Sequence, residues 1–371
     1  MDALALRPGS TAVHIVQRPE PAITAPDDVL VRIIRVGICG TDREIVSGGR
    51  AKAPDGAAEL VIGHEMFGRV EAVGAHVRRV QAGDFAVFTV RRGCGQCLPC
   101  TMNRPDMCRT GAYRERGIWG LDGYQTELVL DKETYVVRVP AELEAVGVLA
   151  EPLSVAEKAI DEAQRIQQAR LPDAAATPDW LFGRRCLVAG LGPIGLLAAL
   201  ALRLRGADVY GLDVVDANTV RPQWLQAIGG HYLDGRATEP AQIAAVAGAM
   251  ELIFEATGVP AIEYNLLDAL APNGIYVLTG IPGGDRPLQI AGAELMRRLV
   301  LNNQAMVGSV NAARDHFQLA VDDLLQAQAR WGHDLLARLI THRYPYTAFS
   351  DALGQHDDGE IKVVLEWEHA Q

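Results

Sequence analysis

The stretch Cys186–Asp216 constrains the fold of this chain more than any other. It reads CLVAGLGPIGLLAALALRLRGADVYGLDVVD, an apolar run followed by a glycine-rich turn, an apolar helical segment and a second apolar run. Runs of this length and composition predict strand, turn, helix and strand in succession. The stretch therefore places the chain in the α/β class, with strands joined by helical crossovers.

The turn of this unit carries Gly190, Gly192 and Gly195 in GxGxxG spacing, and Asp213 follows 18 residues after the last of them. GxGxxG alone is a weak signal, but between a strand and a helix, with an acid ending the next strand, it strongly indicates a dinucleotide-binding fold. Two glycines let a pyrophosphate approach the backbone at the helix N-terminus, and the third lets the helix pack on the sheet. The residues of this turn and strand expected to contact the cofactor are Gly190, Gly192, Pro193, Ile194, Gly195 and Asp213.

Asp213 bears on which dinucleotide binds. Its carboxylate can accept hydrogen bonds from ribose hydroxyls and would repel a 2′-phosphate, and it is followed by Val214 and Val215 instead of arginines. NAD is therefore the preferred cofactor, while Arg221 in the next loop leaves NADP open. The alternative interpretation is a glycine-rich turn in some other α/β fold.

The β-α alternation continues beyond this unit. The runs ELIFEATG and GIYVLTGIP end in small residues, which is typical where a cofactor lies across the carboxyl edge of a parallel sheet. They add Thr257 and Thr279 to the expected cofactor contacts, and the repeated units predict a doubly wound sheet with right-handed crossovers. The segment before Cys186 is mainly β-rich, and the last 60 or so residues are too few for a core of their own. We expect domains at residues 1–182 and 183–308, with 309–371 returning to the first domain.

Four of the six cysteines lie within RRGCGQCLPCTMNRPDMC, at Cys94, Cys97, Cys100 and Cys108. Short CxxC steps let one loop supply four thiolates to a tetrahedral metal, and zinc is the expected occupant. The alternative is a set of disulfides or free thiols, which the intracellular character of the chain disfavours. Because four thiolates close the coordination shell, this lobe is expected to stabilise structure and not to carry out chemistry.

Cys39, His64 and Glu65 make a second candidate metal set, in GICGTD and VIGHEMF. A mixed set of thiol, imidazole and carboxylate suggests a catalytic metal with an open position. Each residue taken singly has a structural alternative: a buried apolar thiol, a hydrogen-bonded core histidine and the partner of a nearby arginine. Glu151, just ahead of a predicted amphipathic helix, would alone be interpreted as a capping residue.

The charge balance, 35 basic against 46 acidic residues, gives a net charge of −11. Nucleic-acid backbones and anionic membranes attract basic surfaces, so neither is expected as a partner. The start of the chain does not resemble a signal peptide, which makes the cytoplasm the expected location.

The motifs GHE, RRGCGQC, RPDMC, LAEPL, GPIG, VGSVN and GEIKVVLEW resemble those of the zinc-dependent medium-chain dehydrogenases over nearly the whole chain. Within them they look like the glucose dehydrogenase branch known from archaea, whose members oxidise aldoses at C1 to lactones. The resemblance implies a GroES-like, mainly β catalytic domain with a doubly wound Rossmann domain, two zinc ions per chain, NAD or NADP, and a homodimer or homotetramer.

The resemblance also implies roles for residues at matching positions. Cys39 and His64 would hold the catalytic zinc, with Glu65 or Glu151 as a further ligand and a water or sugar hydroxyl in the remaining place. Thr41 would relay the proton. Glu115, Glu151 and Asn311 would contact the sugar, and Asn311 would also meet the cofactor.

Two other functions remain as alternatives. A polyol or secondary-alcohol dehydrogenase of the same superfamily would use the same zinc chemistry, and only the sugar-branch motifs favour an aldose. A non-catalytic nucleotide-binding protein would be expected to lose the open metal set, whereas Cys39, Thr41, His64, Glu65 and Glu151 are all present. Val90 and Asn302 stand where some relatives have Asn and His, which leaves the exact sugar open.

Overall fold

The computed structural model describes residues 1–283, 287–354, 357 and 359–368. The chain divides into two compact units. Unit 1 comprises Met1–Ser154, Asn311–Leu325 and Leu336–Gln371, and unit 2 comprises Val155–Val310 and Gln326–Leu335. These limits differ from the expected boundaries at 182 and 308, because helix α3 (Ala150–Arg170) runs on unbroken past Ser154 and residues 155–182 belong to unit 2.

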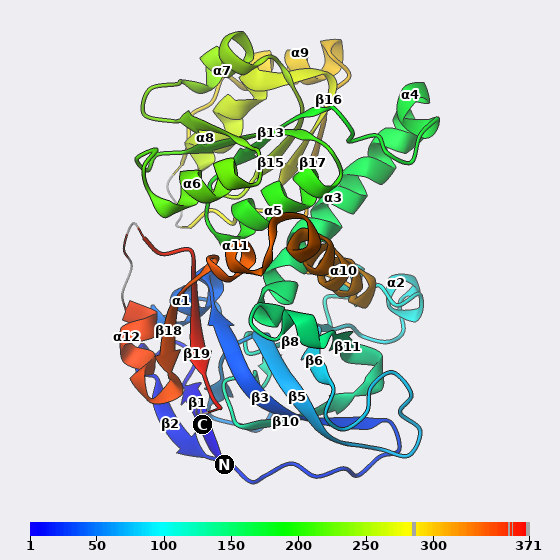
Figure 1. Cartoon of the computed structure of the whole chain (residues 1–371), viewed down its shortest axis with the longest axis vertical. Coiled ribbons are helices and arrows are strands. Elements are labelled where there is room, and N and C mark those ends of the chain that lie inside the picture. Colours follow the sequence, from blue (N-terminus) through cyan, green and yellow to red (C-terminus); the bar gives the residue numbers. More distant parts are fainter. Residues whose placement is uncertain (284–286, 355–356, 358, 369–371) are drawn as a thin grey trace. The chain divides into compact units, whose positions relative to one another are not determined.

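Unit 1 is built on a seven-stranded sheet in the order β11-β6-β5-β3-β19-β18, with β10 also pairing β3 (Figure 1). Its strands are β3 (Asp28–Ile38), β5 (Glu65–Val73), β6 (Phe85–Phe88), β10 (Leu128–Lys132), β11 (Val136–Val139), β18 (Ile340–Pro345) and β19 (Lys362–Glu366). Two smaller sheets contain β1 (Asp2–Leu6), β2 (His14–Gln17) and β4 (Leu60–Val61), and β7 (Arg91–Arg92), β8 (Arg114–Arg116) and β9 (Gly120–Leu121). Short helices α1 (Gly40–Val46), α2 (Leu98–Thr101) and α12 (Phe349–Gly354) complete this mainly β unit.

Strand β3 organises unit 1 because its sequence, DVLVRIIRVGI, is rich in β-branched residues and almost entirely buried. It pairs antiparallel with β5 and with β19, so residues from distant parts of the sequence meet at its carboxyl end. There Gly37 lies opposite Glu65, and Ile38 lies opposite Val363, next to Lys362.

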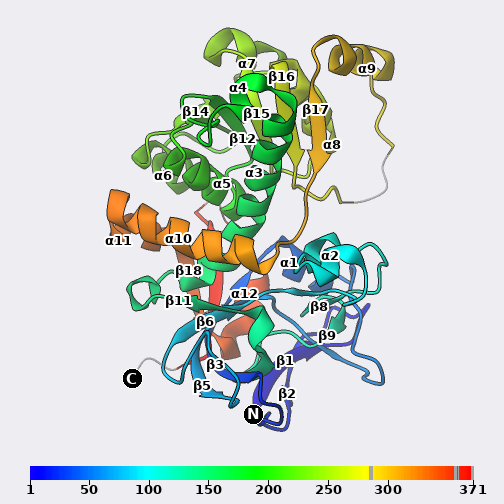
Figure 2. The same ribbon diagram turned by 90° about the vertical axis from the view of Figure 1, so that its right-hand side faces the viewer.

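Unit 2 contains a six-stranded parallel sheet in the order β14-β13-β12-β15-β16-β17. The strands are β12 (Arg185–Ala189), β13 (Asp208–Asp213), β14 (His231–Asp234), β15 (Met250–Glu255), β16 (Leu270–Leu278) and β17 (Ala305–Gly308). The helices that belong wholly to it are α4 (Pro172–Ala175), α5 (Pro193–Leu204), α6 (Val220–Ala227), α7 (Pro240–Ala247), α8 (Pro260–Asn265) and α9 (Gly292–Leu301). Helices lie on both faces of this sheet (Figures 1 and 2), which confirms the predicted doubly wound arrangement.

The apolar segment from Cys186 to Leu202 is largely buried, as predicted. Cys186 and every residue of α5 from Gly195 to Leu202 are buried. Helix α5 has only 12 residues, and no described helix combines the length and apolar character needed to cross a bilayer. Two further helices, α10 (Arg314–Trp331) and α11 (His333–Ala337), have residues in both units.

Candidate functional site

The four cysteines of the lobe come together as predicted from their spacing. The sulfur atoms of Cys94, Cys97, Cys100 and Cys108 all lie within 4.8 Å of one another, and none of them forms a disulfide. Sulfurs about 3.8 Å apart surround a tetrahedral ion whose Zn–S bonds are about 2.3 Å, so the cluster is close to that geometry. Gly93 lies so close to Cys100 that a Cβ there would approach the sulfur to 2.4 Å.

The thiols of the lobe differ widely in pKa. A hydrogen bond with the Thr110 side chain lowers the pKa of Cys94 to about 5, whereas burial raises the pKa of Cys100 to about 12. Four thiolates packed this closely repel one another, and a divalent cation at their centre would stabilise all four. The donor set therefore fits a structural zinc ion.

A second group consists of Cys39, His64 and Glu65, whose candidate ligand atoms also lie within 4.8 Å of one another. Cys39 follows β3 and is the N-cap of α1, and His64 immediately precedes β5. The Cys39 Sγ lies 3.1 Å from the His64 Nε2. Burial raises the pKa of the Cys39 thiol, so its thiolate needs a nearby cation. A thiolate, an imidazole and a carboxylate are the ligand types of an open catalytic zinc site, and this set fits one.

Asp42 lies beside the histidine of this set, a neighbour that was not predicted from the sequence. Its Oδ1 lies 3.5 Å from His64 Nδ1, and its Oδ2 accepts a hydrogen bond of 3.0 Å from the Cys39 backbone N–H. Although burial alone would raise it, the neighbouring His64 holds the pKa of Asp42 below its usual value. A carboxylate behind a ligating imidazole fixes the ring and its tautomer. The available signal was the Cys-x-x-Asp spacing, because the third helical residue commonly caps a helix start.

Glu65 meets a buried cation that the sequence analysis also missed. Lys362, on β19, is 1% exposed and forms an ion pair with Glu65 Oε2. Its Nζ also donates a hydrogen bond of 2.9 Å to the Ile38 carbonyl. Burial lowers the pKa of a lysine, yet Glu65 raises the pKa of Lys362 above its ordinary value. The signal in the sequence was a charged residue directly before the apolar run VVL of the strand KVVLE.

Glu151 was expected in the turn ahead of a helix, but it lies within the first turn of α3, which begins at Ala150. Burial, and then the nearby Glu65, raise the pKa of Glu151 to about 8. The three-residue set within 4.8 Å contains Glu65 and not Glu151. Glu65 is therefore the carboxylate gathered with Cys39 and His64, and Glu151 lies within electrostatic reach of Glu65 and His64.

Thr41 follows Cys39 by two residues, in the first turn of α1. Its backbone N–H donates to Cys39 Sγ at 3.3 Å, and its side chain is half-buried. The Thr41 hydroxyl group is therefore carried by a residue whose backbone contacts the Cys39 sulfur.

Glu115 and Asn311 are brought together, as their shared predicted role requires. Glu115 Oε1 accepts hydrogen bonds from Asn311 Nδ2 at 2.9 Å and from Arg91 Nη2 at 2.9 Å, and Oε2 accepts one from Arg50 at 2.8 Å. Asn311 adopts a positive φ of 64°, and its Oδ1 accepts from Ala312 N. Both side chains are held rigidly, and Glu115 is the acceptor for two arginines.

The GxGxxG turn borders a cavity of about 400 Å³ in unit 2, lined also by Asp213, Thr257 and Val259. Gly190 has φ +86°, and a Cβ on Gly195 would come within 1.8 Å of the Gly190 carbonyl oxygen. A Cβ on Gly192 would meet nothing within 4 Å, which leaves room for a ligand beside the start of α5. The turn therefore fits a pyrophosphate as the fingerprint predicts.

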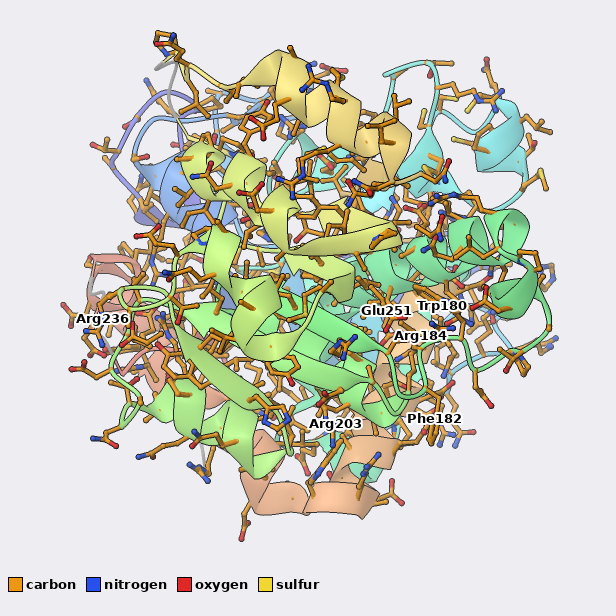
Figure 3. All side chains as sticks on the ribbon, turned by 90° about the horizontal axis from the view of Figure 1, so that it is seen from above. Trp180, Phe182, Arg184, Arg203, Arg236 and Glu251 are labelled. Atoms are coloured by element: carbon orange, nitrogen blue, oxygen red, sulfur yellow. The ribbon has the colours of Figure 1, made fainter. Side chains whose placement is uncertain are left out.

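Asp213 lies at the end of β13 with both oxygens engaged. Oδ2 accepts from Leu191 N at 2.8 Å, and Oδ1 accepts from Val214 N at 2.7 Å. Arg221 lies 3.9 Å from Asp213 Oδ2, so an acid and a guanidinium are adjacent in this cavity. Arg236, labelled in Figure 3, is ion-paired with Asp216 and with Asp234, each at 2.7 Å.

Thr257 and Thr279 lie just beyond the ends of β15 and β16, as predicted, but their hydroxyls are turned into the protein. Thr257 Oγ1 donates to Glu255 Oε1 and accepts from Val259 N at 3.0 Å. Thr279 Oγ1 donates to the Glu255 carbonyl at 2.7 Å. Of the two, Thr257 lines the cavity, so its methyl group and backbone are the parts left to meet a ligand.

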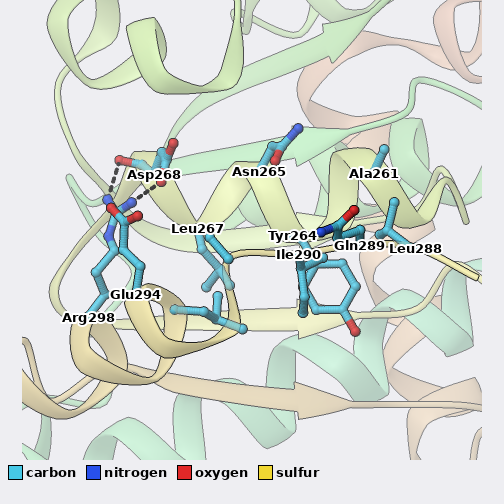
Figure 4. Close-up of a pocket in the computed structure, with 12 residues that line it drawn as sticks. Ala261, Tyr264, Asn265, Leu267, Asp268, Leu288, Gln289, Ile290, Glu294 and Arg298 are labelled. Atoms are coloured by element: carbon cyan, nitrogen blue, oxygen red, sulfur yellow. Dashed lines mark hydrogen bonds and ion pairs between the residues drawn. The ribbon is translucent and has the colours of Figure 1, made fainter.

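A neighbouring cavity of about 300 Å³ lies between α8 and α9, and Figure 4 shows its lining. Asp268 and Arg298 form an ion pair at one end, and Leu267, Leu288 and Ile290 supply apolar walls. The glycine-rich turn does not line this cavity, so the larger cavity is the one that fits a dinucleotide.

Comparison with protein families gives two matches along the chain. Residues 25–141 match the alcohol dehydrogenase GroES-like domain, and residues 144–367 match the glucose dehydrogenase C-terminus. Together they span both units, in agreement with the predicted GroES-like and Rossmann arrangement.

Individual relatives match over nearly their whole length. The chain is 39% identical to glucose 1-dehydrogenase 2 of Vulcanisaeta moutnovskia over 99% of both chains, and 38% identical to glucose 1-dehydrogenase of Methanocella arvoryzae over the same share. Among solved structures it is similar to Haloferax mediterranei glucose dehydrogenase in complex with NADP, Zn and gluconolactone. That match has a TM-score of 0.87 and 32% identity, and it covers 100% of both chains.

Proposed function

The chain belongs to the glucose dehydrogenase family of zinc-dependent medium-chain dehydrogenases, and from this premise we propose that it oxidises glucose or a related aldose at C1 to the lactone. The sugar would lose a hydride from C1 to a nicotinamide cofactor and a proton from its C1 hydroxyl. The observation that carries the proposal is the meeting of Cys39, His64 and Glu65 in one set. A chain that had kept only the scaffold would not need these three ligands together.

The side chains assigned to the catalytic zinc are Cys39, His64 and one of the two glutamates. When bound, zinc would supply a Lewis acid that lowers the pKa of the C1 hydroxyl. Asp42 would keep the His64 ring in its ligating orientation, and Lys362 would offset the charge of Glu65. We assign Glu65 as the glutamate ligand because it lies within the set, with Glu151 as the carboxylate beside it.

The remaining residues handle the sugar and its proton. Thr41 would pass the hydroxyl proton toward solvent from its place beside Cys39. Glu115 and Asn311 would hold the sugar hydroxyls, since both are fixed by hydrogen bonds before any substrate arrives. Hydride transfer itself is the chemistry of the nicotinamide.

For the cofactor we propose NAD in preference to NADP, with NADP also accepted. The Asp213 carboxylate in the cavity supports NAD, because it would repel a 2′-phosphate. Arg221 beside it supports use of NADP, since a guanidinium can pair with that phosphate. The Haloferax mediterranei relative was solved with NADP.

The four-cysteine lobe supports a second zinc ion per chain, with a structural role. Each of its ligands is a protein thiol, which leaves no position for substrate. We propose the cytoplasm as the location, because a zinc site made of four thiolates requires cysteines that stay reduced.

The same zinc chemistry would serve a polyol or secondary-alcohol dehydrogenase, which is the second candidate. The experiment that separates them follows reduced cofactor with NAD and with NADP across aldoses, sorbitol, threonine and simple alcohols. The proposal predicts the highest kcat/KM with an aldose. A polyol as the best substrate would replace it with the second candidate. Cofactor binding without turnover of any compound, in zinc-replete protein, would support a non-catalytic role.

We further propose that the chain forms a homodimer or homotetramer. Strand β17 ends the order of the parallel sheet, and α9, near it in Figure 2, exposes Met296, Val300 and Leu301. An edge strand beside exposed apolar side chains is suited to pairing with the same surface of a second copy. Light scattering during gel filtration tests this proposal, and Val300→Glu should shift the protein toward monomer. A monomeric wild type would contradict it.

A further inference from the structure

We propose that Glu255 is a positioning residue for the dinucleotide, one that holds together the two strand-end loops at the carboxyl edge of β15 and β16. The proposal rests on the proposed function of the cavity beside the GxGxxG turn. Glu255 itself is not among the residues lining that cavity. It would act through Thr257 and Gly258 on one side and through Thr279 and Gly280 on the other.

Glu255 is the last residue of β15 and is fully buried. Its strand lies between β12 and β16, with Glu255 opposite Ala189 and Leu278. A carboxylate is rarely placed in the middle of a parallel sheet, because an ionised group removed from water must be compensated by strong hydrogen bonds. The compensation here comes from the loop after β15, which donates to Oε1, while the buried Oε2 has no hydrogen-bond partner among the described residues.

The side chain of Glu255 fastens the first loop. Oε1 accepts hydrogen bonds from Thr257 N at 2.5 Å, from Thr257 Oγ1, and from Gly258 N at 3.0 Å. Three donors converging on one carboxylate oxygen are charge-assisted, and such hydrogen bonds are stronger than those between neutral groups. The path of residues 256–258 is therefore set by this single oxygen.

The backbone of Glu255 fastens the second loop. Its carbonyl oxygen accepts from Thr279 N at 2.9 Å, from Gly280 N at 3.2 Å and from Thr279 Oγ1 at 2.7 Å. Because the same residue holds both loops, a shift at Glu255 would move them together.

Close packing connects the two loops held by Glu255 to the cavity. A Cβ on Gly280 would come within 2.3 Å of Gly258 N and 2.5 Å of Glu255 Oε2, so the two loops touch with no space for a side chain. A Cβ on Gly190 would come within 3.0 Å of the Thr257 methyl group. The loop held by Glu255 thus packs directly on the first glycine of the dinucleotide turn.

The test replaces Glu255 with Gln and measures dinucleotide affinity without sugar, by fluorescence titration with NADH and NADPH. Gln has nearly the same size, but its neutral oxygen is a weaker acceptor, and its amide would place donors against Gly280. We expect the dissociation constant to rise about tenfold, while kcat at saturating cofactor stays within about twofold of wild type.

Glu157→Gln is the matched control, because Glu157 is also a fully buried glutamate of unit 2, is paired with Arg205 and does not line the cavity. Its dissociation constant should stay within about twofold of wild type. A purely structural role for Glu255 would lower the melting temperature of Glu255→Gln without changing its cofactor affinity, and that result would overturn the proposal.

If Glu255→Gln fails to fold, Thr257→Val supplies the second test, since it removes one donor to Oε1 and leaves the carboxylate in place. It should weaken cofactor binding several-fold, and unchanged binding would overturn the proposal. Wild-type protein that binds neither dinucleotide would instead remove the proposed function of the cavity, and the positioning role with it.

Discussion

His64 uses its two ring nitrogens for two different neighbours: Nε2 lies 3.1 Å from the Cys39 sulfur, and Nδ1 lies 3.5 Å from the Asp42 carboxylate. The ring is thereby held between a thiol that can bind metal and an acid that orients it. Asp42 is itself fixed by the Cys39 backbone N–H. We therefore infer that metal binding by Cys39, His64 and Glu65 depends on a residue outside this set.

Asp42→Asn should weaken zinc binding at this set about 10- to 100-fold, because an orienting carboxylate behind a ligating histidine typically contributes that much. Competition with a chromophoric chelator measures the affinity. Asp55→Asn is the control, since Asp55 is 94% exposed in its pair with Lys52. Equal zinc affinity in the Asp42 variant and the control would contradict the assigned role.

Lys362→Met should destabilise unit 1 by about 3 kcal/mol, because removing one partner of a buried ion pair leaves an uncompensated charge. The partner left behind is Glu65, which is 1% exposed. Adding Glu65→Gln to Lys362→Met should recover part of the loss in urea unfolding of the metal-free protein. Lys52→Met, at an exposed pair, should change stability by less than about 0.5 kcal/mol. Additive effects of the two buried substitutions would disprove the coupling.

Cys94→Ser should remove one zinc ion per chain and lower thermal stability before it lowers the chemical rate, because the lobe has no open position. Metal analysis, melting temperature and kcat are the three measurements. A Cys94→Ser variant that has normal stability and normal zinc content but no activity would contradict the structural role of the lobe.

Asp28 should make folding stability depend on pH in the acid range. Burial would raise its pKa, but hydrogen bonds from Lys132, Thr24 and Ala25 lower the pKa of Asp28 from 3.8 to about 2. A carboxyl whose pKa is depressed by folding contributes stability above its unfolded pKa and loses it as pH falls through the folded pKa. The contribution should be complete above about pH 4 and nearly gone at about pH 2.

Asp28→Asn should accordingly lower the free energy of unfolding by about 1–2 kcal/mol near pH 7. The difference from wild type should shrink between about pH 4 and pH 2. Urea unfolding at a series of pH values measures it. Asp27→Asn is the control, because it removes only the ion pair between Asp27, which is 50% exposed, and Lys132, which is 41% exposed. It should have little effect on stability at any pH. A difference for Asp28→Asn that does not vary with pH would contradict this assignment.

Asp213→Ala should shift cofactor preference toward NADP by at least about tenfold in kcat/KM, because it removes the charge that opposes a 2′-phosphate. Arg221→Ala should act in the opposite direction, lowering use of NADP more than use of NAD. Steady-state rates with both cofactors measure each variant. Equal losses of kcat/KM with NAD and with NADP in both variants would show that Asp213 and Arg221 do not discriminate between the two cofactors.

The parts of the molecule that could be predicted from sequence are those specified by local spacing. The strand, turn and helix around Gly190–Gly195 follow from neighbouring residues, as does the four-cysteine lobe. Glu115 and Asn311 were paired only through the family resemblance, and the structure shows the hydrogen bond that joins them.

The parts that could not be predicted depend on contacts between distant segments. Lys362 reaches Glu65 because β19 pairs with β3 after the chain has returned from unit 2, and no local pattern encodes that pairing. Glu255 looks in the sequence like an ordinary strand end, and its six hydrogen bonds appear only when the loops after β15 and β16 are in place. We expected a domain limit at 182, whereas the two compact units of the structure divide within α3, after Ser154.

The most direct test of the central claim compares wild type and His64→Ala, both zinc-replete, with glucose and either dinucleotide, and quantifies lactone and reduced cofactor. The wild type should form the two products in equal amounts. His64→Ala should lose turnover while keeping its fold by circular dichroism and retaining the zinc of the four-cysteine lobe. A His64→Ala protein with the wild-type rate would contradict the assignment of the catalytic site, and absence of lactone from any aldose tested with the wild type would contradict the proposed reaction.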